Sequence, residues 1–338
     1  MVARLKRQLK RIAEDALAPF APLTWRTRPA PRLLVLMYHR VLPASHADRA
    51  IEQPGMYVSP ETLDMHLTLL KRRFEIVHLD DWLRAAAAAK ALPPQSCAVT
   101  FDDGWQDNFE FAFPVLQRHS CPATIFLVSA MTGTRGEFWP NRLARTLLRL
   151  PVDMQLAGPL GEVLAPLTAG VRASGRWSLE QLDHAVGLAK QLQESQINIA
   201  IDELQAPAAA CDVTRAVLNE GELHQMAASG LVRFGSHTRT HYRLRGEVPA
   251  EVLQQEIAGS SAEISASTGS ATRLFCYPNG DLTSAAVDVV RQHYLGAVTT
   301  QKGWHTPAAD PYLIRRIGVH EDISSRPAAF LARISGLP

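Results

Sequence analysis

Short apolar segments alternate with longer amphipathic segments along most of the chain. Each apolar segment has the length of one strand and is followed by polar residues, a pattern typical of buried strands in a parallel sheet. These segments predict strands at residues 33–37, 75–78, 97–101, 123–128, 231–235, 273–277, 296–300 and 312–319. The amphipathic segments between them predict helices at residues 60–70, 80–90, 109–119, 220–229, 249–268 and 283–293.

The repeated order of strand, loop and helix indicates parallel strands joined by crossover helices. Seven or eight such strands fit a closed or nearly closed β/α barrel better than an open sheet. The repeat stops at about residues 139–218, where several helical patterns occur without a clear strand. We therefore expect residues 31–338 to form an α/β fold: a distorted (β/α) barrel of about seven parallel strands with a mainly helical insertion.

Residues 1–30 have a different pattern, which predicts a basic amphipathic helix followed by a linker. Leu5, Leu9 and Ile12 would share one helical face, whereas arginines and lysines crowd the other faces. One interpretation is that residues 4–20 make a peripheral contact with an anionic membrane surface. The other is a helix that docks on the barrel and keeps its charges in water.

Charge and composition narrow the range of functions. The 35 basic and 33 acidic residues leave a net charge of +2, which argues against a nucleic acid as partner. The four cysteines are widely spaced, as reduced thiols of a cytosolic protein are. We find neither a signal peptide nor an apolar run of the ~20 residues that a membrane-spanning helix requires. We therefore expect a cytoplasmic location, with attachment to the inner face of the cell membrane if the first helix adsorbs there.

Asp102 and Asp103 follow the predicted strand at residues 97–101, at the strand end where β/α barrels build their active sites. Adjacent carboxylates repel each other unless a cation or a proton is present. Gly104 permits a kink that turns both side chains toward one cavity. The alternative is a pair of acidic turn residues, one of which caps the next helix.

His237 and His241 follow the predicted strand at residues 231–235, with three residues between them. Two imidazoles at this spacing can bind one metal ion, and a carboxylate from another strand completes a set with open coordination positions. The alternative is ordinary hydrogen bonding within a loop. In combination with Asp102 and Asp103, the histidine pair favours a metal site.

The predicted strand at residues 273–277 runs into a turn formed by Tyr277, Pro278, Asn279 and Gly280. Such a turn can direct a backbone N–H toward a cavity in which an oxyanion forms. Considered alone, it is equally an ordinary type I or type II turn.

These three segments together resemble the polysaccharide deacetylase family, also called the NodB-homology domain or carbohydrate esterase family 4. The resemblance rests on Thr-Phe-Asp-Asp-Gly at 100–104, His-x-x-x-His at 237–241 and Tyr-Pro-x-Gly at 277–280, in the family's order. Weaker similarities lie at residues 36–41, 122–126 and 296–300.

The resemblance implies a deacetylase that hydrolyses the N-acetyl group of an amino sugar in a polysaccharide. The expected cytoplasmic location and the basic first helix add a lipid-linked glycan precursor as a candidate substrate. It implies that Asp103, His237 and His241 bind a divalent metal ion, most often zinc. Asp102 would be the general base that takes a proton from the attacking water. A backbone N–H near Asn279 would stabilise the oxyanion.

The chain departs from the family pattern in the third motif and in the position of the general acid, the group that protonates the leaving nitrogen. Better-known members carry an arginine and a second aromatic residue in the third motif, where this chain has Cys276 and Asn279. The family's general acid is a histidine near the last strand. His320 is the first candidate for this role, ahead of His305 and His39.

Several side chains in the predicted loops are candidates for contact with a sugar ring. They are His39, Trp105, Trp139, Tyr277, Pro278 and Trp304. Two other functions stay open: a glycan-binding module that has lost turnover, and a metal-dependent amidohydrolase of small molecules. The departures at Cys276 and Asn279 motivate the first, whereas the retained Asp102 argues against it.

Overall fold

The computed structural model describes residues 31–151, 153–154, 156–205 and 215–335. The helix expected within residues 1–30 lies outside this part of the chain. The chain divides into two compact units. Of the described residues, those within 31–43, 55–134 and 217–335 form the first unit, and those within 44–54 and 135–216 form the second. Among the described residues, no helix has both the length and the hydropathy needed to cross a membrane.

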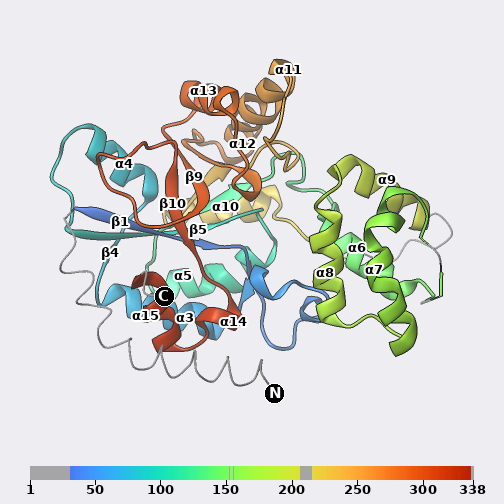
Figure 1. The fold of residues 1–338 in the computed structure, drawn as a ribbon. Helices are drawn as coiled ribbons and strands as arrows, with labels where there is room; N and C mark the ends of the chain where they lie inside the picture. Colours follow the sequence, from blue (N-terminus) through green and yellow to red (C-terminus); the bar gives the residue numbers. More distant parts are fainter. Residues whose placement is uncertain (1–30, 152, 155, 206–214, 336–338) are drawn as a thin grey trace. The chain divides into compact units, whose positions relative to one another are not determined.

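The first unit contains the predicted barrel, a closed ring of seven parallel strands (Figure 1). The ring closes at β1 (Arg32–Tyr38), which pairs with β5 (Gln95–Phe101) on one side and with β10 (Ile314–Gly318) on the other. From β5 round to β10 the other members are β6 (Ala123–Leu127), β7 (Val232–Ser236), β8 (Leu274–Cys276) and β9 (Gly296–Lys302).

Three short strands lie outside this ring. The predicted strand near residue 75 is β4 (Glu75–Ile76), which pairs with the beginning of β5. A separate two-stranded sheet consists of β2 (Arg40–Val41) and β3 (Tyr57–Val58).

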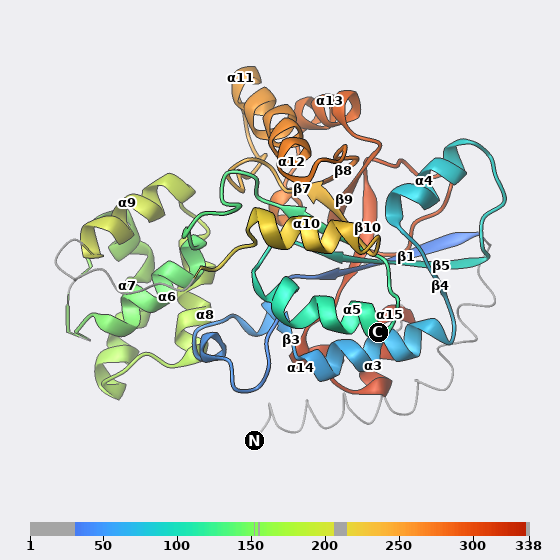
Figure 2. The same ribbon diagram turned by 180° about the vertical axis from the view of Figure 1, so that it is seen from behind.

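Helices surround the barrel (Figures 1 and 2). They are α3 (Pro60–Lys71), α4 (Leu79–Ala87), α5 (Phe113–Arg118), α10 (Glu220–Ala228), α11 (Ala250–Leu253), α12 (Ser260–Thr268), α13 (Ser284–His293), α14 (Glu321–Ser324) and α15 (Pro327–Ser335). Inside the barrel, Val35, Phe126 and Val298 belong to one buried apolar cluster, to which α4 adds Trp82 and Leu83. The helices thus bury one face each, whereas the barrel strands are buried on both faces, as their sequence patterns predict.

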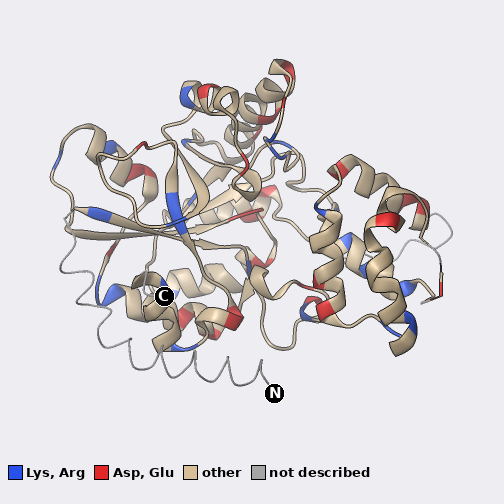
Figure 3. Ribbon diagram, viewed as in Figure 1, with Lys and Arg blue, Asp and Glu red and all other residues tan. Residues whose placement is uncertain are grey.

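The second unit is built from helices around an apolar core of its own. Its helices are α6 (Trp139–Arg149), α7 (Gly158–Ser174), α8 (Leu179–Ala189) and α9 (Glu194–Gln205). A capping box begins α8, with Ser178 and Gln181 bonded to each other's backbone N–H. Residues Ala44–Pro54 also belong to this unit, which no sequence pattern indicates. Figure 3 shows basic and acidic positions interspersed in both units.

Candidate active site

The chain turns sharply at the end of β5, and this turn separates the two carboxylates. Asp103 (φ 75°) and Gly104 (φ 73°) both have positive φ, which residues other than glycine seldom adopt. A β carbon at residue 104 would lie 2.7 Å from Cδ2 of Leu127, so a larger residue would clash there. As a result Asp102 and Asp103, although adjacent, have different partners.

Asp103, His237 and His241 come together as one candidate metal cluster. Oδ1 of Asp103 lies 3.5 Å from Nε2 of His237 and 3.7 Å from Nε2 of His241. One ligand atom from each of the three residues lies within 4.8 Å of the other two. Two imidazoles and one carboxylate at these distances fit a single divalent cation.

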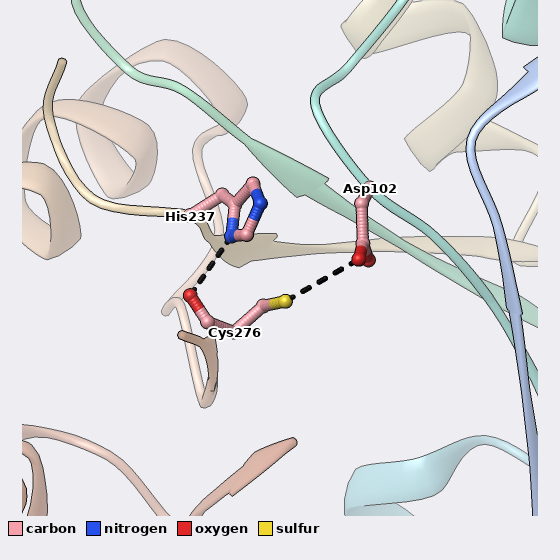
Figure 4. A group of neighbouring side chains, drawn as sticks. All are labelled: Asp102, His237 and Cys276. Carbon is pink, nitrogen blue, oxygen red and sulfur yellow. Dashed lines mark hydrogen bonds between the residues drawn. The ribbon is translucent and has the colours of Figure 1, made fainter. Parts of the chain in front are cut away.

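The surroundings of His237 are those expected of a metal ligand. Its Nδ1 bonds to the carbonyl oxygen of Cys276 at 2.8 Å (Figure 4). Because a carbonyl only accepts, Nδ1 must carry the hydrogen, and Nε2 therefore presents its lone pair toward Asp103. Burial lowers the pKa of His237 to about 4, so the imidazole is neutral at pH 7.

Trp105 binds the second oxygen of Asp103 and does not face a sugar, so the expected stacking role is wrong. Its indole N–H donates to Oδ2 of Asp103 at 2.9 Å, and only 2% of the residue is exposed. The guanidinium of Arg40 lies 4.1 Å from the ring centre and forms an ion pair with Asp107. Arg40 covers one face of the ring and Asp103 binds its N–H, and the low exposure leaves no face of the ring open to a ligand.

Asp102 is bound by a residue that the sequence analysis missed, Arg316 of β10. The Nη1 and Nη2 atoms of Arg316 each donate to one oxygen of Asp102 at 2.7 Å, and both side chains are buried. Burial alone would raise the pKa of Asp102, but the charge and hydrogen bonds of Arg316 hold it well below its usual value. Asp102 is therefore a carboxylate at neutral pH.

A sequence signal for Arg316 exists. Ile314, Arg316 and Gly318 alternate along β10 on the side that faces the barrel interior, so an arginine occupies a position where the pattern calls for an apolar residue. A buried charge of this kind requires a partner of opposite charge.

Cys276 leaves space for this ion pair. Its Sγ lies 3.2 Å from Nη2 of Arg316 and 3.5 Å from Oδ2 of Asp102 (Figure 4). Burial raises the pKa of the Cys276 thiol well above its usual value, so the group is neutral. A neutral, compact side chain lets the guanidinium of Arg316 reach Asp102.

Two further histidines lie on the open side of the site. Nε2 of His39 is 3.9 Å from Oδ2 of Asp102, and this side chain is 20% exposed. His320 follows β10, and its Nδ1 is hydrogen-bonded to the carboxylate of Asp322. Burial lowers the pKa of His320, while the charge of Asp322 opposes that shift. The charge of His39 also lowers the pKa of His320.

The sequence model of the polysaccharide deacetylase family matches residues 89–154 and 193–298. The chain belongs to this family. The matched segments contain both aspartates of the turn and both histidines of the candidate metal cluster. The match to the family therefore includes the residues of the candidate active site.

Comparisons with individual proteins also find polysaccharide deacetylases and other deacetylases. YxkH of Bacillus subtilis (strain 168), which bears the name of a polysaccharide deacetylase, is 43% identical over 42 residues, or 12% of this chain and 15% of YxkH. The fold is similar to that of the deacetylase PplD of Streptococcus pyogenes in complex with acetate, with a TM-score of 0.59, 17% identity and coverage of 91% of this chain and 99% of PplD. It is also similar to a de-N-acetylase of Aggregatibacter actinomycetemcomitans, with a TM-score of 0.54, 18% identity and coverage of 86% and 95%.

Two other aromatic residues expected to bind sugar lie elsewhere in this deacetylase fold. Tyr277 is buried, with its ring centre 5.1 Å from that of Phe275, because side chains alternate in direction where β8 ends and Cys276 faces inward. Trp304 packs against Phe74 and donates its N–H to the carbonyl of Ile334. Neither ring offers a face to a ligand at the site.

His305 is also distant from the site, which excludes it as a general acid. It pairs with Leu33 at the beginning of β1, whereas Asp102 follows the end of the neighbouring β5. The start and the end of parallel strands are opposite ends of a barrel.

The turn after β8 lies against β9. Asn279 is exposed and has φ 55°, and its carbonyl accepts a hydrogen bond from Oγ1 of Thr300 at 3.2 Å. Pro278 is buried, so the expected contact of its ring with a substrate is contradicted. The role of the Asn279 N–H toward an oxyanion stays a prediction.

Proposed function

We propose that this polysaccharide deacetylase domain is a metal-dependent hydrolase that removes the acetyl group from the nitrogen of an amino sugar. The observation that carries the proposal is the division between the adjacent carboxylates. Asp103 faces two histidine nitrogens, whereas Asp102 is paired with Arg316 and remains ionised. One carboxylate is thus available as a metal ligand and the other as a base.

Asp103, His237 and His241 would hold the metal ion. Three protein ligands of the nitrogen and oxygen type are characteristic of catalytic zinc sites, which makes zinc the first candidate. A bound divalent ion supplies Lewis acidity, which lowers the pKa of water and polarises a carbonyl group. Because the indole N–H of Trp105 is hydrogen-bonded to Oδ2 of Asp103, Asp103 would bind the ion through Oδ1.

Asp102 would accept the proton of the water that attacks the amide carbon. Its ionised state at neutral pH follows from Arg316, which also fixes the orientation of both carboxylate oxygens. His39, at 3.9 Å, is the neighbour through which this proton can leave Asp102. The N–H of Asn279 would stabilise the oxyanion.

Cleavage of the carbon–nitrogen bond requires a proton on the departing nitrogen, because an amide anion is a very poor leaving group. We assign this proton to His320. Its Nδ1 is held by Asp322, and Nε2 would be the atom that donates the proton. The products are acetate and a free amine.

The substrate we propose is an N-acetylated glycan, either a polysaccharide or a lipid-linked precursor. PplD and the relative from Aggregatibacter actinomycetemcomitans are named for the removal of acetyl groups, which supports this substrate class. The basic residues within positions 4–20 would bring a cytoplasmic enzyme to lipid-linked precursors at the membrane.

Acetate release from N-acetylglucosamine oligosaccharides tests the proposal. The zinc-loaded protein should release acetate, and Asp102→Asn should reduce the rate at least ~100-fold while metal content stays stoichiometric. Asp103→Asn should instead lose the metal ion. Metal-loaded protein that is inert on every N-acetylated sugar, yet binds glycans, would support a binding module. A wild-type protein without stoichiometric metal, with glycan binding unchanged by His237→Ala, would refute the site.

A further inference from the structure

The backbone between His237 and His241 has an uncommon conformation. Thr238 has φ 61° and His241 has φ 63°, both in the left-handed region that residues with a side chain occupy only when their surroundings hold them there. On the carbonyl side, the oxygens of Thr238 and Arg239 accept hydrogen bonds from the N–H groups of residues 129 and 130, at 3.3 and 2.8 Å. The amide side needs a separate anchor.

Glu256 is this anchor. Its Oε2 accepts hydrogen bonds from the backbone N–H of Arg239 at 3.0 Å and of Thr240 at 2.9 Å. Its Oε1 accepts one from the hydroxyl of Thr240 at 2.8 Å, and the residue is only 7% exposed. Successive N–H groups that converge on one anion form a nest, and a charged acceptor strengthens each bond.

Glu256 reaches the loop from a wide turn in a helix. The helix that begins as α11 continues through a π-helical segment, Gln254–Gly259, into α12. A π turn changes the direction of the side chains relative to a regular α-helix, and such turns are frequent at functional sites. Here the π-helical segment contains Glu256, the residue that binds the backbone between His237 and His241.

We infer that Glu256 is a positioning residue for the candidate metal site. It fixes the backbone between the two histidines and so sets the direction in which His241 presents Nε2 to Asp103. Glu256 acts through the amides of Arg239 and Thr240, not as a ligand. The inference rests on the proposed function, because it assumes that the cluster binds a metal ion.

Glu263 provides a matched control for Glu256. It lies further along the same helix and accepts hydrogen bonds only from side chains, from Arg239 of the loop at 2.8 Å and from the hydroxyl of Ser129 at 2.6 Å. Its side chain is 40% exposed. Glu256→Gln and Glu263→Gln each remove one negative charge near the loop. Only the first weakens the bonds to the backbone.

The dissociation constant for Co²⁺, measured by competition with a chromophoric chelator, tests the inference. Glu256→Gln should weaken binding by about tenfold or more and change the visible absorption spectrum of the bound cobalt, as loss of a supporting partner of a ligand does. Glu263→Gln should stay within about twofold of the wild type, because an exposed ion pair contributes little. If Glu256→Gln does not fold, Thr240→Val removes the hydrogen bond from the Thr240 hydroxyl to Oε1 of Glu256 and should weaken Co²⁺ binding several-fold.

A purely structural role for Glu256 gives a different result. Its substitution would then lower the melting temperature of the metal-free protein but leave the cobalt affinity and spectrum unchanged, and the inference would be wrong while the proposed function stood. A wild-type protein that binds no Co²⁺ at all would overturn the proposed function and the inference together.

Discussion

The guanidinium of Arg316 and the carboxylate of Asp102 form a buried two-point ion pair between residues 214 positions apart in the chain. Arg316 also donates its Nε–H to the carbonyl of Thr299 at 2.9 Å. The guanidinium plane is therefore held by Asp102 through its Nη atoms and by Thr299 through Nε. The orientation of the candidate base therefore depends on the last strand of the barrel.

Arg316→Met will leave Asp102 buried without a cation. Removal of one partner of a buried ion pair costs about 3–5 kcal/mol of unfolding free energy, which urea denaturation will measure. Acetate release should fall at least ~100-fold, because the base loses its orientation and its low pKa. Arg315, the exposed neighbour in β10, is the control. Arg315→Met should change stability by less than about 0.5 kcal/mol. Equal effects of the two substitutions would contradict the importance of the ion pair.

Trp105→Phe will keep a ring beneath Arg40 but remove the N–H that binds Oδ2 of Asp103. We expect about tenfold weaker zinc binding, because Asp103 can then rotate away from the two histidine nitrogens. Trp304→Phe also removes one indole hydrogen bond, to the carbonyl of Ile334, and should leave zinc affinity unchanged. Chelator competition on both variants will show whether the effect belongs to Trp105 alone.

Asp322→Asn will shift the pH dependence of turnover. Burial lowers the pKa of His320 below its usual value of 6.5, and the charge of Asp322 raises it. If the protonated imidazole donates the proton, kcat/KM falls as the pH rises through this pKa. Without Asp322 the pKa drops further, so the falling limb should move to lower pH. Asp288→Asn, at an exposed position of α13, should leave the profile unchanged. A limb that does not move would argue against His320 as the acid.

Gly104→Ala will destabilise the turn that separates the carboxylates. Gly230 has nearly the same φ, 71° against 73°, but no atom lies within 4 Å of the place its β carbon would take, so Gly230→Ala reports the cost of the backbone conformation alone. That cost is about 1 kcal/mol, and the clash with Leu127 should add about 1–3 kcal/mol in Gly104→Ala. Urea denaturation of the metal-free proteins will give the difference. Similar losses for both would show that Leu127 moves aside.

The strands and helices of the barrel could be predicted because the strands are short apolar runs buried on both faces and the helices bury one face, and both patterns are local in sequence. The pair of aspartates and the pair of histidines were also predictable, because they follow strands whose ends meet at one end of the barrel. The order of the motifs then made the family recognisable before any distance was known.

The partners of the candidate catalytic residues could not be predicted, because they depend on contacts between residues far apart in the sequence. The partner of Asp102 lies two strands away through β1, so only the closed ring brings Arg316 near it. The direction of an aromatic side chain in a loop depends on where a strand ends, which is why the expected roles of Trp105, Tyr277 and Trp304 were wrong. The bond from Glu256 required a π turn, which has no clear signature in the sequence.

Closure of the ring by β1 and β10 has a consequence for synthesis on the ribosome. Until Ile314–Gly318 has emerged, β1 lacks one neighbour and β9 is an open edge, and Asp102 is a buried acid without its counter-ion. Open edges invite pairing between nascent chains. Premature termination before β10 should therefore yield insoluble fragments rather than a less active enzyme.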